Sequence, residues 1–257
     1  LGGIKASELL EVITKIVIEQ QSESLKILDG IKVKLKEKNI FIIDESEITN
    51  SQSTYLKEYF YQYVSPALVT IILSDDVDLR LLKDSASYLA VKMTIENGDN
   101  QYALMEIPRT IDRFVVLPNE KGKDYIIMLD DLLRYFMHDI FSIFDYHSIS
   151  AHMIKMTRDG ELDFDSDLST SFLKKISDSV KHRQIGAPLR LVYDKTIAED
   201  TLTYIMSKMG IDYTDSLIPG GRYHNRRDYM KFPSLGGQDL LYPKINPLPI
   251  TGLSLQS

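Results

Sequence analysis

Residues 89–107 read LAVKMTIENGDNQYALMEI. In the first half, apolar side chains alternate with Lys92 and Thr94, which is the period-two pattern of a strand with one buried face. The turn sequence NGDN follows at residues 97–100, and residues 102–107 resume the apolar run. Two such runs joined by an Asn-Gly turn predict an antiparallel β-hairpin, so the fold contains a sheet.

Downstream of this hairpin, strand and helix patterns alternate. Short runs rich in β-branched and aromatic residues predict further strands, at residues 114–117, 125–129, 149–157 and 189–193. Helical periodicity predicts helices at residues 130–141, 166–181 and 197–209, the last of them stopped by Gly210. A turn is expected at residues 219–221, and the prolines of residues 242–250 predict an extended segment.

Upstream of the hairpin the pattern is helical. Apolar residues recur three or four apart over residues 7–38, which predicts one long amphipathic helix with Ser7 as N-cap and Asn39 as its stop. A second helical piece is expected at residues 54–64, ended by Pro66. The fold class is therefore α+β: an N-terminal helical, hairpin-like segment followed by a mostly antiparallel sheet with packed helices.

Composition excludes several classes of function. The 257 residues carry 30 Lys+Arg against 37 Asp+Glu, a net charge of −7, so a general nucleic-acid binder is not expected. Without cysteine, disulfides, thiolate catalysis and iron–sulfur clusters are excluded, and a cytoplasmic protein is favoured. No apolar run is long enough to span a bilayer. The missing initiator Met predicts a piece cut from a longer protein.

The sequence contains no motif specific for catalysis, such as a Gly-rich phosphate loop or H-E-x-x-H. The histidines lack metal-ligand spacing, so we predict no metal residue. The paired acids Asp75-Asp76 and Asp130-Asp131 are interpreted as capping, solvated side chains rather than magnesium ligands. The sequence therefore predicts no catalytic residue in this chain.

A basic segment, GGRYHNRRDYMK at residues 220–231, stands out in this acidic chain. We consider it a candidate polyphosphate- or anion-binding site, made of Arg222, His224, Arg226, Arg227 and Lys231. If the segment were α-helical, Arg222 and Arg226 would share one stripe, and Arg227 and Lys231 a neighbouring one. Two alternatives stay open: a solvated basic face, and ion pairing to an acidic surface of a second subunit.

Six segments, in order, resemble the N-terminal and head (middle) regions of bacterial polyphosphate kinase. They are GGIKASELLEVI…EQQ (2–21), YLKEYFYQYVSPAL (55–68), ALMEIPRTIDRFVVLP (103–118), MTRDGELDFD (156–165), RQIGAPLRLVYD (183–194) and GGRYHNRRDYMKFP (220–233). The series covers nearly the whole chain.

The resemblance implies a four-part enzyme that transfers the terminal phosphate of ATP reversibly to inorganic polyphosphate through a phosphohistidine. It implies that ATP, Mg²⁺ and the catalytic histidine are held by C-terminal domains outside this chain. Residues 1–60 would be part of the N-terminal helical domain, 61–235 the head domain, related to the phosphohistidine phosphatase fold, and 236–257 a Pro-rich linker. The head would build a homodimer and position substrates, and the fragment alone would be inactive.

Two other functions remain open. The chain could be a free-standing interaction module that binds anionic or phosphorylated partners through the basic segment. The head-like part could instead be a small phosphatase or phosphotransferase that uses His147, His152 or His224, although no base with an orienting partner is recognisable. For the location, the resemblance implies the cytoplasm, with peripheral association with the inner membrane in some members of the family.

Overall fold

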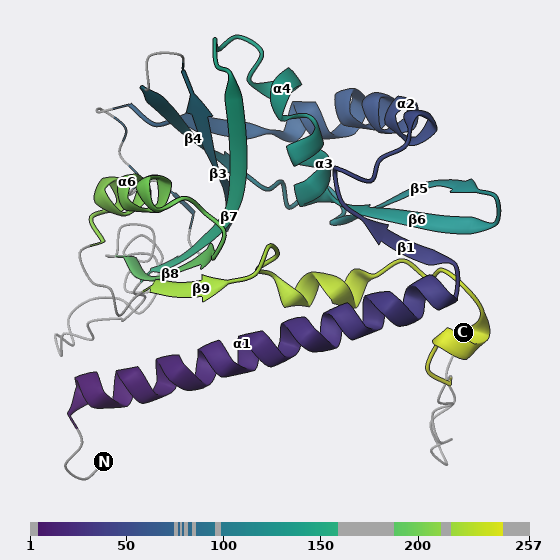
Figure 1. Cartoon of the computed structure of the whole chain (residues 1–257), viewed down its shortest axis with the longest axis horizontal. Coiled ribbons are helices and arrows are strands. Elements are labelled where there is room, and N and C mark those ends of the chain that lie inside the picture. Colours follow the sequence, from purple (N-terminus) through teal and green to yellow (C-terminus); the bar gives the residue numbers. More distant parts are fainter. Residues whose placement is uncertain are drawn as a thin grey trace, which may run out of the picture.

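The computed structural model describes residues 5–74, 77, 79, 82–83, 86–95, 99–158, 188–211 and 217–243. The helix predicted at residues 166–181, the Asn97-Gly98 turn, the Asp75-Asp76 pair and most of the Pro-rich tail lie outside these residues. Two sheets lie above one long helix that runs along the molecule (Figure 1). This arrangement confirms the predicted α+β class.

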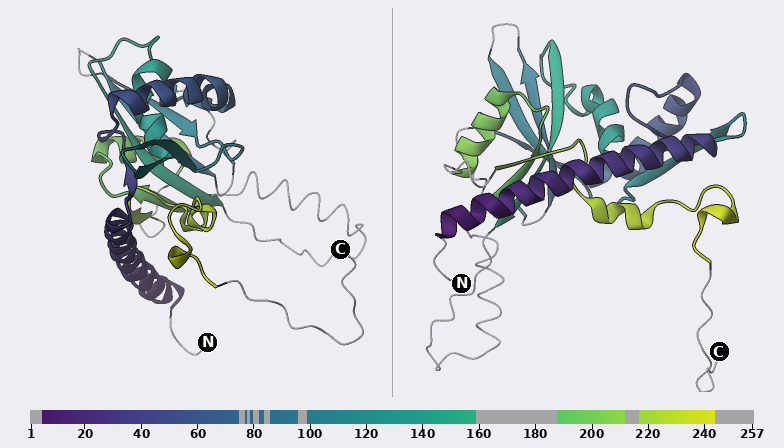
Figure 2. Two further views of the ribbon diagram at one scale, coloured as in Figure 1. Left: turned by 90° about the vertical axis from the view of Figure 1, so that its right-hand side faces the viewer. Right: turned by 60° about the horizontal axis from the view of Figure 1, so that its bottom comes forward.

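The long helix is α1 (Ala6–Glu37), which confirms the helix predicted at residues 7–38. Its N-cap is Lys5, with no side-chain cap, so the expected role of Ser7 is wrong. Asn39, with a φ of 60°, follows the last turn and confirms the predicted stop. The C-terminal end of the helix leads into the smaller of the two sheets, and Figure 2 shows the helix extending well past that sheet.

The smaller sheet has three strands in the order β1-β6-β5. Its members are β1 (Ile40–Ile43), β5 (Phe114–Glu120) and β6 (Lys123–Met128). Strand β1 runs parallel to β6, whereas β5 and β6 form an antiparallel hairpin. The sequence pattern predicts no strand at residues 40–43, because a run of four apolar residues does not reveal a partner more than 80 positions later.

The larger sheet has six strands in the order β2-β4-β3-β7-β8-β9. These are β2 (Val69–Ile72), β3 (Ser87–Thr94), β4 (Asn100–Glu106), β7 (Ser148–Arg158), β8 (Pro188–Asp194) and β9 (Leu217–Gly220). The β3–β4 pairing confirms the predicted hairpin. All neighbours are antiparallel except β8 and β9, which are parallel and joined through α6 (Glu199–Met209).

The turn predicted at residues 219–221 is wrong, because Pro219 and Gly220 end strand β9. Proline is tolerated there because β9 is an edge strand, where the missing N–H leaves no ladder bond unmade. Strand β2 also has no counterpart among the predictions. At the end of α6, Gly210 adopts a left-handed conformation with a φ of 65°, which confirms the predicted helix stop.

Short helices fill the space between the sheets. Helix α2 (Asn50–Tyr59) continues into a π-helical turn at Phe60–Val64, and α3 (Leu129–Tyr135) and α4 (Met137–Ile140) follow β6 directly. The main core joins α2 and α3 to one face of the larger sheet, and α6 covers the opposite face. A third cluster lies on the smaller sheet, where Phe114 and Met128 meet Leu35 of α1 and Tyr229 and Phe232 of the C-terminal segment.

Candidate functional site

Two adjacent carboxylates, Asp130 and Asp131, lie in the first turn of α3 and are completely buried. Their place in the first turn agrees with the prediction, but the expectation that they are solvated is wrong. A buried carboxylate is retained only where cations and hydrogen-bond donors compensate it. Arginines from distant parts of the chain supply that compensation here.

One oxygen of Asp131 accepts hydrogen bonds from two arginines. Arg134 Nη1 lies 2.7 Å from Oδ1, and Arg222 Nε and Nη2 lie 2.9 and 2.8 Å from the same atom. The hydroxyl of Tyr223 donates to Oδ2, and Arg222 Nη2 also bonds Glu45. Burial raises the pKa of Asp131, while the two guanidinium groups oppose that shift. The geometry is that of an ionised carboxylate.

The second carboxylate is held in the same way. Arg113 Nη2 donates to Asp130 Oδ1 over 2.8 Å, and Arg113 Nε forms an ion pair of 2.9 Å with Asp228 Oδ2. Burial raises the pKa of Asp228, with the charge of Arg113 opposing it. The two buried acids therefore hold the basic segment at two points: Asp131 binds Arg222 near its start, and Asp130 binds Arg113, which pairs with Asp228 further along.

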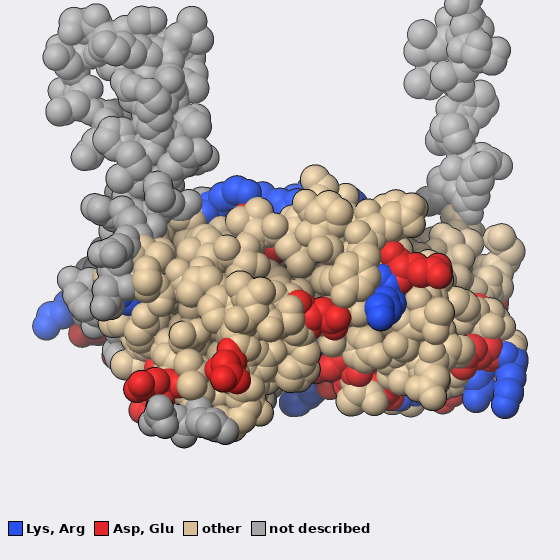
Figure 3. Space-filling model, turned by 90° about the horizontal axis from the view of Figure 1, so that it is seen from above, with Lys and Arg blue, Asp and Glu red and all other residues tan. Residues whose placement is uncertain are grey.

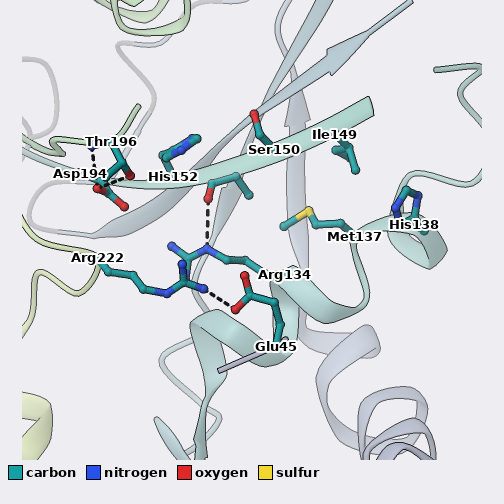
Figure 4. Close-up of a pocket in the computed structure, with 11 residues that line it drawn as sticks. Glu45, Arg134, Met137, His138, Ile149, Ser150, His152, Asp194, Thr196 and Arg222 are labelled. Atoms are coloured by element: carbon teal, nitrogen blue, oxygen red, sulfur yellow. Dashed lines mark hydrogen bonds and ion pairs between the residues drawn. The ribbon is translucent and has the colours of Figure 1, made fainter. Parts of the chain in front are cut away.

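A pocket of about 320 Å³ opens beside this network (Figure 4). Its charged lining residues follow the carboxyl ends of parallel strands: Glu45 follows β1, Arg134 follows β6, Asp194 ends β8 and Arg222 follows β9. Loops and helix starts at the carboxyl ends of parallel strands are common places for ligand crevices. Two parallel pairs from different sheets thus converge on one cavity.

The rest of the pocket wall comes from β7 and α4. These two elements supply Met137, His138, Ile149, Ser150, Ala151 and His152, and Thr196, in the loop between β8 and α6, completes the wall. Burial lowers the pKa of His152, with the charge of Asp194 opposing that shift. His152 is one of the three histidines considered for a phosphatase, and it is the one that lines this pocket. His147 is exposed and lies immediately before β7.

The structure separates the members of the predicted basic site. Arg222 and Tyr223 turn inward to Asp131, and both ring nitrogens of His224 are buried, which lowers its pKa to about 4. The predicted α-helical stripes do not form, because Arg222 precedes the helix and residues Arg226–Lys231 form a 3₁₀ helix. Arg227 and Lys231 are exposed and Arg226 is half-buried. Within the described part of the chain, these three cations make no ion pair.

Sequence reasoning missed Asp131, Arg134 and Arg113 as site residues. The spacing of Asp131 and Arg134, three apart on a helix, was available as a signal for a local ion pair. The contribution of Arg222 was not, since it comes from 91 residues downstream. Among the described residues there is no group of three or more His, Asp or Glu side chains that could hold a metal ion, and no described helix is long and apolar enough to cross a membrane.

The fold and the site thus define an α+β domain. It has a buried Asp–Arg network and a pocket at the ends of its strands. Residues 51–232 match the family described as "Polyphosphate kinase middle domain", and the chain belongs to that family. The resemblance read from the sequence motifs is confirmed.

Relatives named polyphosphate kinase align with most of this chain. The protein of Vibrio vulnificus strain YJ016 is 39% identical over 217 residues, which cover 82% of this chain and 30% of the relative. That of Escherichia coli K12 is 36% identical over 247 residues, which cover 94% of this chain and 35% of the relative. The chain therefore spans about a third of the length of these relatives.

A solved structure shares the fold. The crystal structure of polyphosphate kinase from Porphyromonas gingivalis superimposes with a TM-score of 0.73 at 25% sequence identity. The superposition covers 94% of this chain and 34% of that one.

Proposed function

We propose that this chain is the middle part of a polyphosphate kinase, and that the whole protein transfers the terminal phosphate of ATP to inorganic polyphosphate. The observation that carries the proposal is the family match over residues 51–232, together with relatives that align over 82% to 94% of the chain. We assign ATP, Mg²⁺ and the phosphohistidine to parts of the protein outside this chain. Its proposed location is the cytoplasm, either free or against the inner membrane.

The proposed activity is tested by comparing two proteins. The full-length protein and this 257-residue chain are each incubated with labelled ATP, Mg²⁺ and a short polyphosphate primer, and labelled polyphosphate is measured. We expect synthesis by the full-length protein and none by the chain alone. No synthesis by the full-length protein contradicts the kinase assignment, and synthesis by the chain contradicts the assignment of catalysis to other domains.

We propose that this part of the enzyme holds the segments that contact substrates in fixed positions. The support is the Asp131 network, which ties the loop after β1, the start of α3 and the segment after β9 to one buried carboxylate. Buried and charge-paired contacts of this kind fix geometry more strongly than exposed ones. Substrates that bind along the basic segment would contact side chains carried on a backbone that the Asp131 network holds in place.

The proposed surface for the polyanion consists of the cations of the basic segment that remain free to bind it: Arg226, Arg227 and Lys231. Arg222 and His224 hold the segment in place from inside. Replacing both Arg227 and Lys231 by Ala in the full-length protein should weaken polyphosphate binding and flatten its salt dependence, because fewer counterions are released. A double Ala variant at Lys57 and Lys121 serves as the matched control, and equal affinities in both variants contradict this assignment.

Homodimerisation is the second proposed role. The face on the side of α2 and α4, away from α1, is mostly uncharged (Figure 3). Large apolar side chains are exposed on α2, the turn after it and the edge strand β2, among them Tyr61, Tyr63 and Val69, each 50% exposed. An uncharged surface with exposed aromatic residues favours protein–protein contact.

The dimer is tested by size-exclusion chromatography with light scattering. We expect twice the chain mass of 29.4 kDa, and a return to the monomer mass in Val69→Lys, because a charged edge strand resists pairing. Val116→Lys, on the edge strand β5 of the other sheet, is the control that should stay dimeric. A monomer at all concentrations overturns this role.

A free-standing module that binds anionic or phosphorylated partners remains the alternative function. It predicts that the chain alone binds its anionic partner with full affinity. It also predicts that the chain is not part of a larger protein with kinase activity.

A further inference from the structure

Arg134 has an unsatisfied end inside the pocket. Its side chain is only 6% exposed, its Nε donates to the carbonyl of Ala151 over 3.0 Å, and its Nη1 donates to Asp131. Its Nη2 is buried and has no hydrogen-bond partner among the described residues. A buried, charged donor without a partner is costly, so an acceptor in the cavity would be favoured.

Arg222 presents a matching end. Its Nε and Nη2 are used on Asp131 and Glu45, whereas its Nη1 makes no hydrogen bond within the described residues. Both guanidinium groups are anchored on the same oxygen, Asp131 Oδ1, and they lie next to each other at the floor of the pocket (Figure 4). Two fixed guanidinium groups with one free nitrogen each suit the oxygens of a tetrahedral oxyanion.

An acceptor lies across the same pocket. Asp194 uses its Oδ1 to accept hydrogen bonds from the amide and hydroxyl of Thr196, at 3.0 and 2.7 Å, and its Oδ2 accepts none from the residues that the structure describes. An ionised carboxylate only accepts hydrogen bonds, so a ligand that contacts it must bring a proton. The charges that line the pocket also favour a ligand that carries a proton. Asp131 and Glu45 already balance the two arginines, and Asp194 adds one negative charge.

We propose that this pocket binds a phosphate group that carries a proton, with Arg134 and Arg222 donating to its oxygens and Asp194 accepting from its P–O–H. Two sources have that chemistry: free orthophosphate and the terminal group of a polyphosphate chain, of which the second rests on the proposed function. Terminal phosphates titrate near neutral pH. Interior units of polyphosphate and sulfate carry no proton there, so the pocket distinguishes chain ends from chain interiors.

The size and mouth of the pocket agree with this ligand. A volume of about 320 Å³ is larger than one phosphate group, which leaves space for ordered water or for the next unit of a chain. Ser150 is exposed and lies on the pocket wall formed by β7. It offers a position where a substitution reaches the ligand without disturbing the core.

Four probes are titrated calorimetrically into the 257-residue chain at pH 7 and constant ionic strength: orthophosphate, sulfate, linear tripolyphosphate and cyclic trimetaphosphate, which has no terminal group. We expect orthophosphate and tripolyphosphate to bind. Sulfate and trimetaphosphate should bind about tenfold to a hundredfold more weakly, the ratio that one charge-assisted hydrogen bond provides. Binding of orthophosphate without tripolyphosphate identifies free phosphate as the ligand, and the reverse identifies the chain end.

Two variants locate the site, each with a matched control. Asp194→Asn should reduce the preference for orthophosphate over sulfate, whereas Asp200→Asn, an exposed carboxylate on α6, should not. Ser150→Glu places a negative charge at the pocket and should abolish binding, whereas Ser148→Glu, two residues earlier on the same strand, should preserve it. Circular dichroism of each variant establishes that it is folded.

The inference is overturned if orthophosphate and tripolyphosphate both fail to bind, which leaves water as the occupant of the pocket. It is also overturned if sulfate binds as well as orthophosphate, or if Ser150→Glu binds normally. Polyphosphate synthesis by the full-length protein, measured in parallel, keeps the two questions apart. Synthesis without phosphate binding to this pocket refutes the pocket alone, and binding without synthesis refutes the kinase assignment alone.

Discussion

Asp131 accepts three N–H donors on one oxygen and a hydroxyl on the other, while being completely buried. Asp131→Asn removes the charge and turns an amide N–H₂ toward guanidinium groups that remain buried. We expect a loss of about 3 to 5 kcal/mol in the free energy of unfolding, the usual result of removing one partner of a buried ion pair. Urea denaturation measures it. Asp145→Asn, at an exposed position, should change stability by less than about 0.5 kcal/mol.

His224 gives stability a specific pH dependence. Both ring nitrogens are buried, and burial lowers the pKa from 6.5 to about 4. The unfolded chain therefore takes up a proton before the folded one does. The stability that depends on a neutral His224 is therefore fully present above pH 6.5. As the pH falls toward 4, the free energy of unfolding decreases by about 3 kcal/mol in total.

The measurement is urea denaturation at pH 7, 5.5 and 4 for the wild type and for His224→Gln. The variant should lose less stability between pH 7 and 4, since other acid-sensitive groups are common to both proteins. Parallel curves for the two proteins would contradict the account.

At the scale of single residues, the sequence predicted where charged residues cluster along the chain but not which groups their side chains contact. Arg222 was predicted as part of a basic cluster, but its side chain is bound by Asp131 and Glu45, which come from other elements. Asp130 and Asp131 look like solvated capping residues in sequence. Their burial depends on Arg113 and Arg222, and no local pattern links those positions.

Helix α2 begins with a capping box. The side chain of Thr49 accepts from the Gln52 amide, the Gln52 side chain accepts from the Thr49 amide, and the Thr49 hydroxyl also donates to Glu120 on β5 over 3.0 Å. Thr49→Ala removes the cap and the link between helix and sheet. We expect a loss of about 1 to 2 kcal/mol in the free energy of unfolding, measured by thermal or urea denaturation.

The matched control is Thr54→Ala, the same change one turn further along the exposed face of α2. It should be neutral or slightly stabilising, because alanine favours the helix interior. Equal losses at the two positions would show that the cap contributes nothing beyond helix propensity.

At the scale of elements, periodicity identified what local sequence determines. The long helix α1, the β3–β4 hairpin and helix α6 follow from spacing, turn residues and a stop glycine. Strands β1, β2 and β9 did not, because each has only four residues and is defined by its neighbours in the sheets. The pocket depends on β1 and β9, because Glu45 and Arg222 follow them, so its existence could not be predicted.

The whole molecule depends on its C-terminal segment. Tyr223, Tyr229, Phe232 and Leu235 cover the outer face of the smaller sheet, and Arg222 neutralises Asp131. A chain that ends at residue 220 should therefore fail to fold the smaller sheet, whereas one that ends at residue 243 should fold like the full chain. Hydrogen exchange of β1 and β6 measures this. Normal protection in the shorter chain would contradict it.

The boundaries proposed at residues 60 and 235 remain predictions. Strand β1 lies before the first boundary and pairs with β6 beyond it, so a cut at residue 60 would separate two strands of one sheet.

Arg222 contacts Glu45 across a sequence separation of 177 residues. During synthesis on the ribosome, the nascent chain therefore carries both buried aspartates long before the arginine that compensates one of them has left the exit tunnel. Until then, Asp131 has only the local Arg134 as a cationic partner and lacks the donors of Arg222, so its burial is less favourable than in the complete fold. We therefore expect the domain to close late in translation, when Arg222 reaches Glu45 and Asp131 and completes the wall of the pocket.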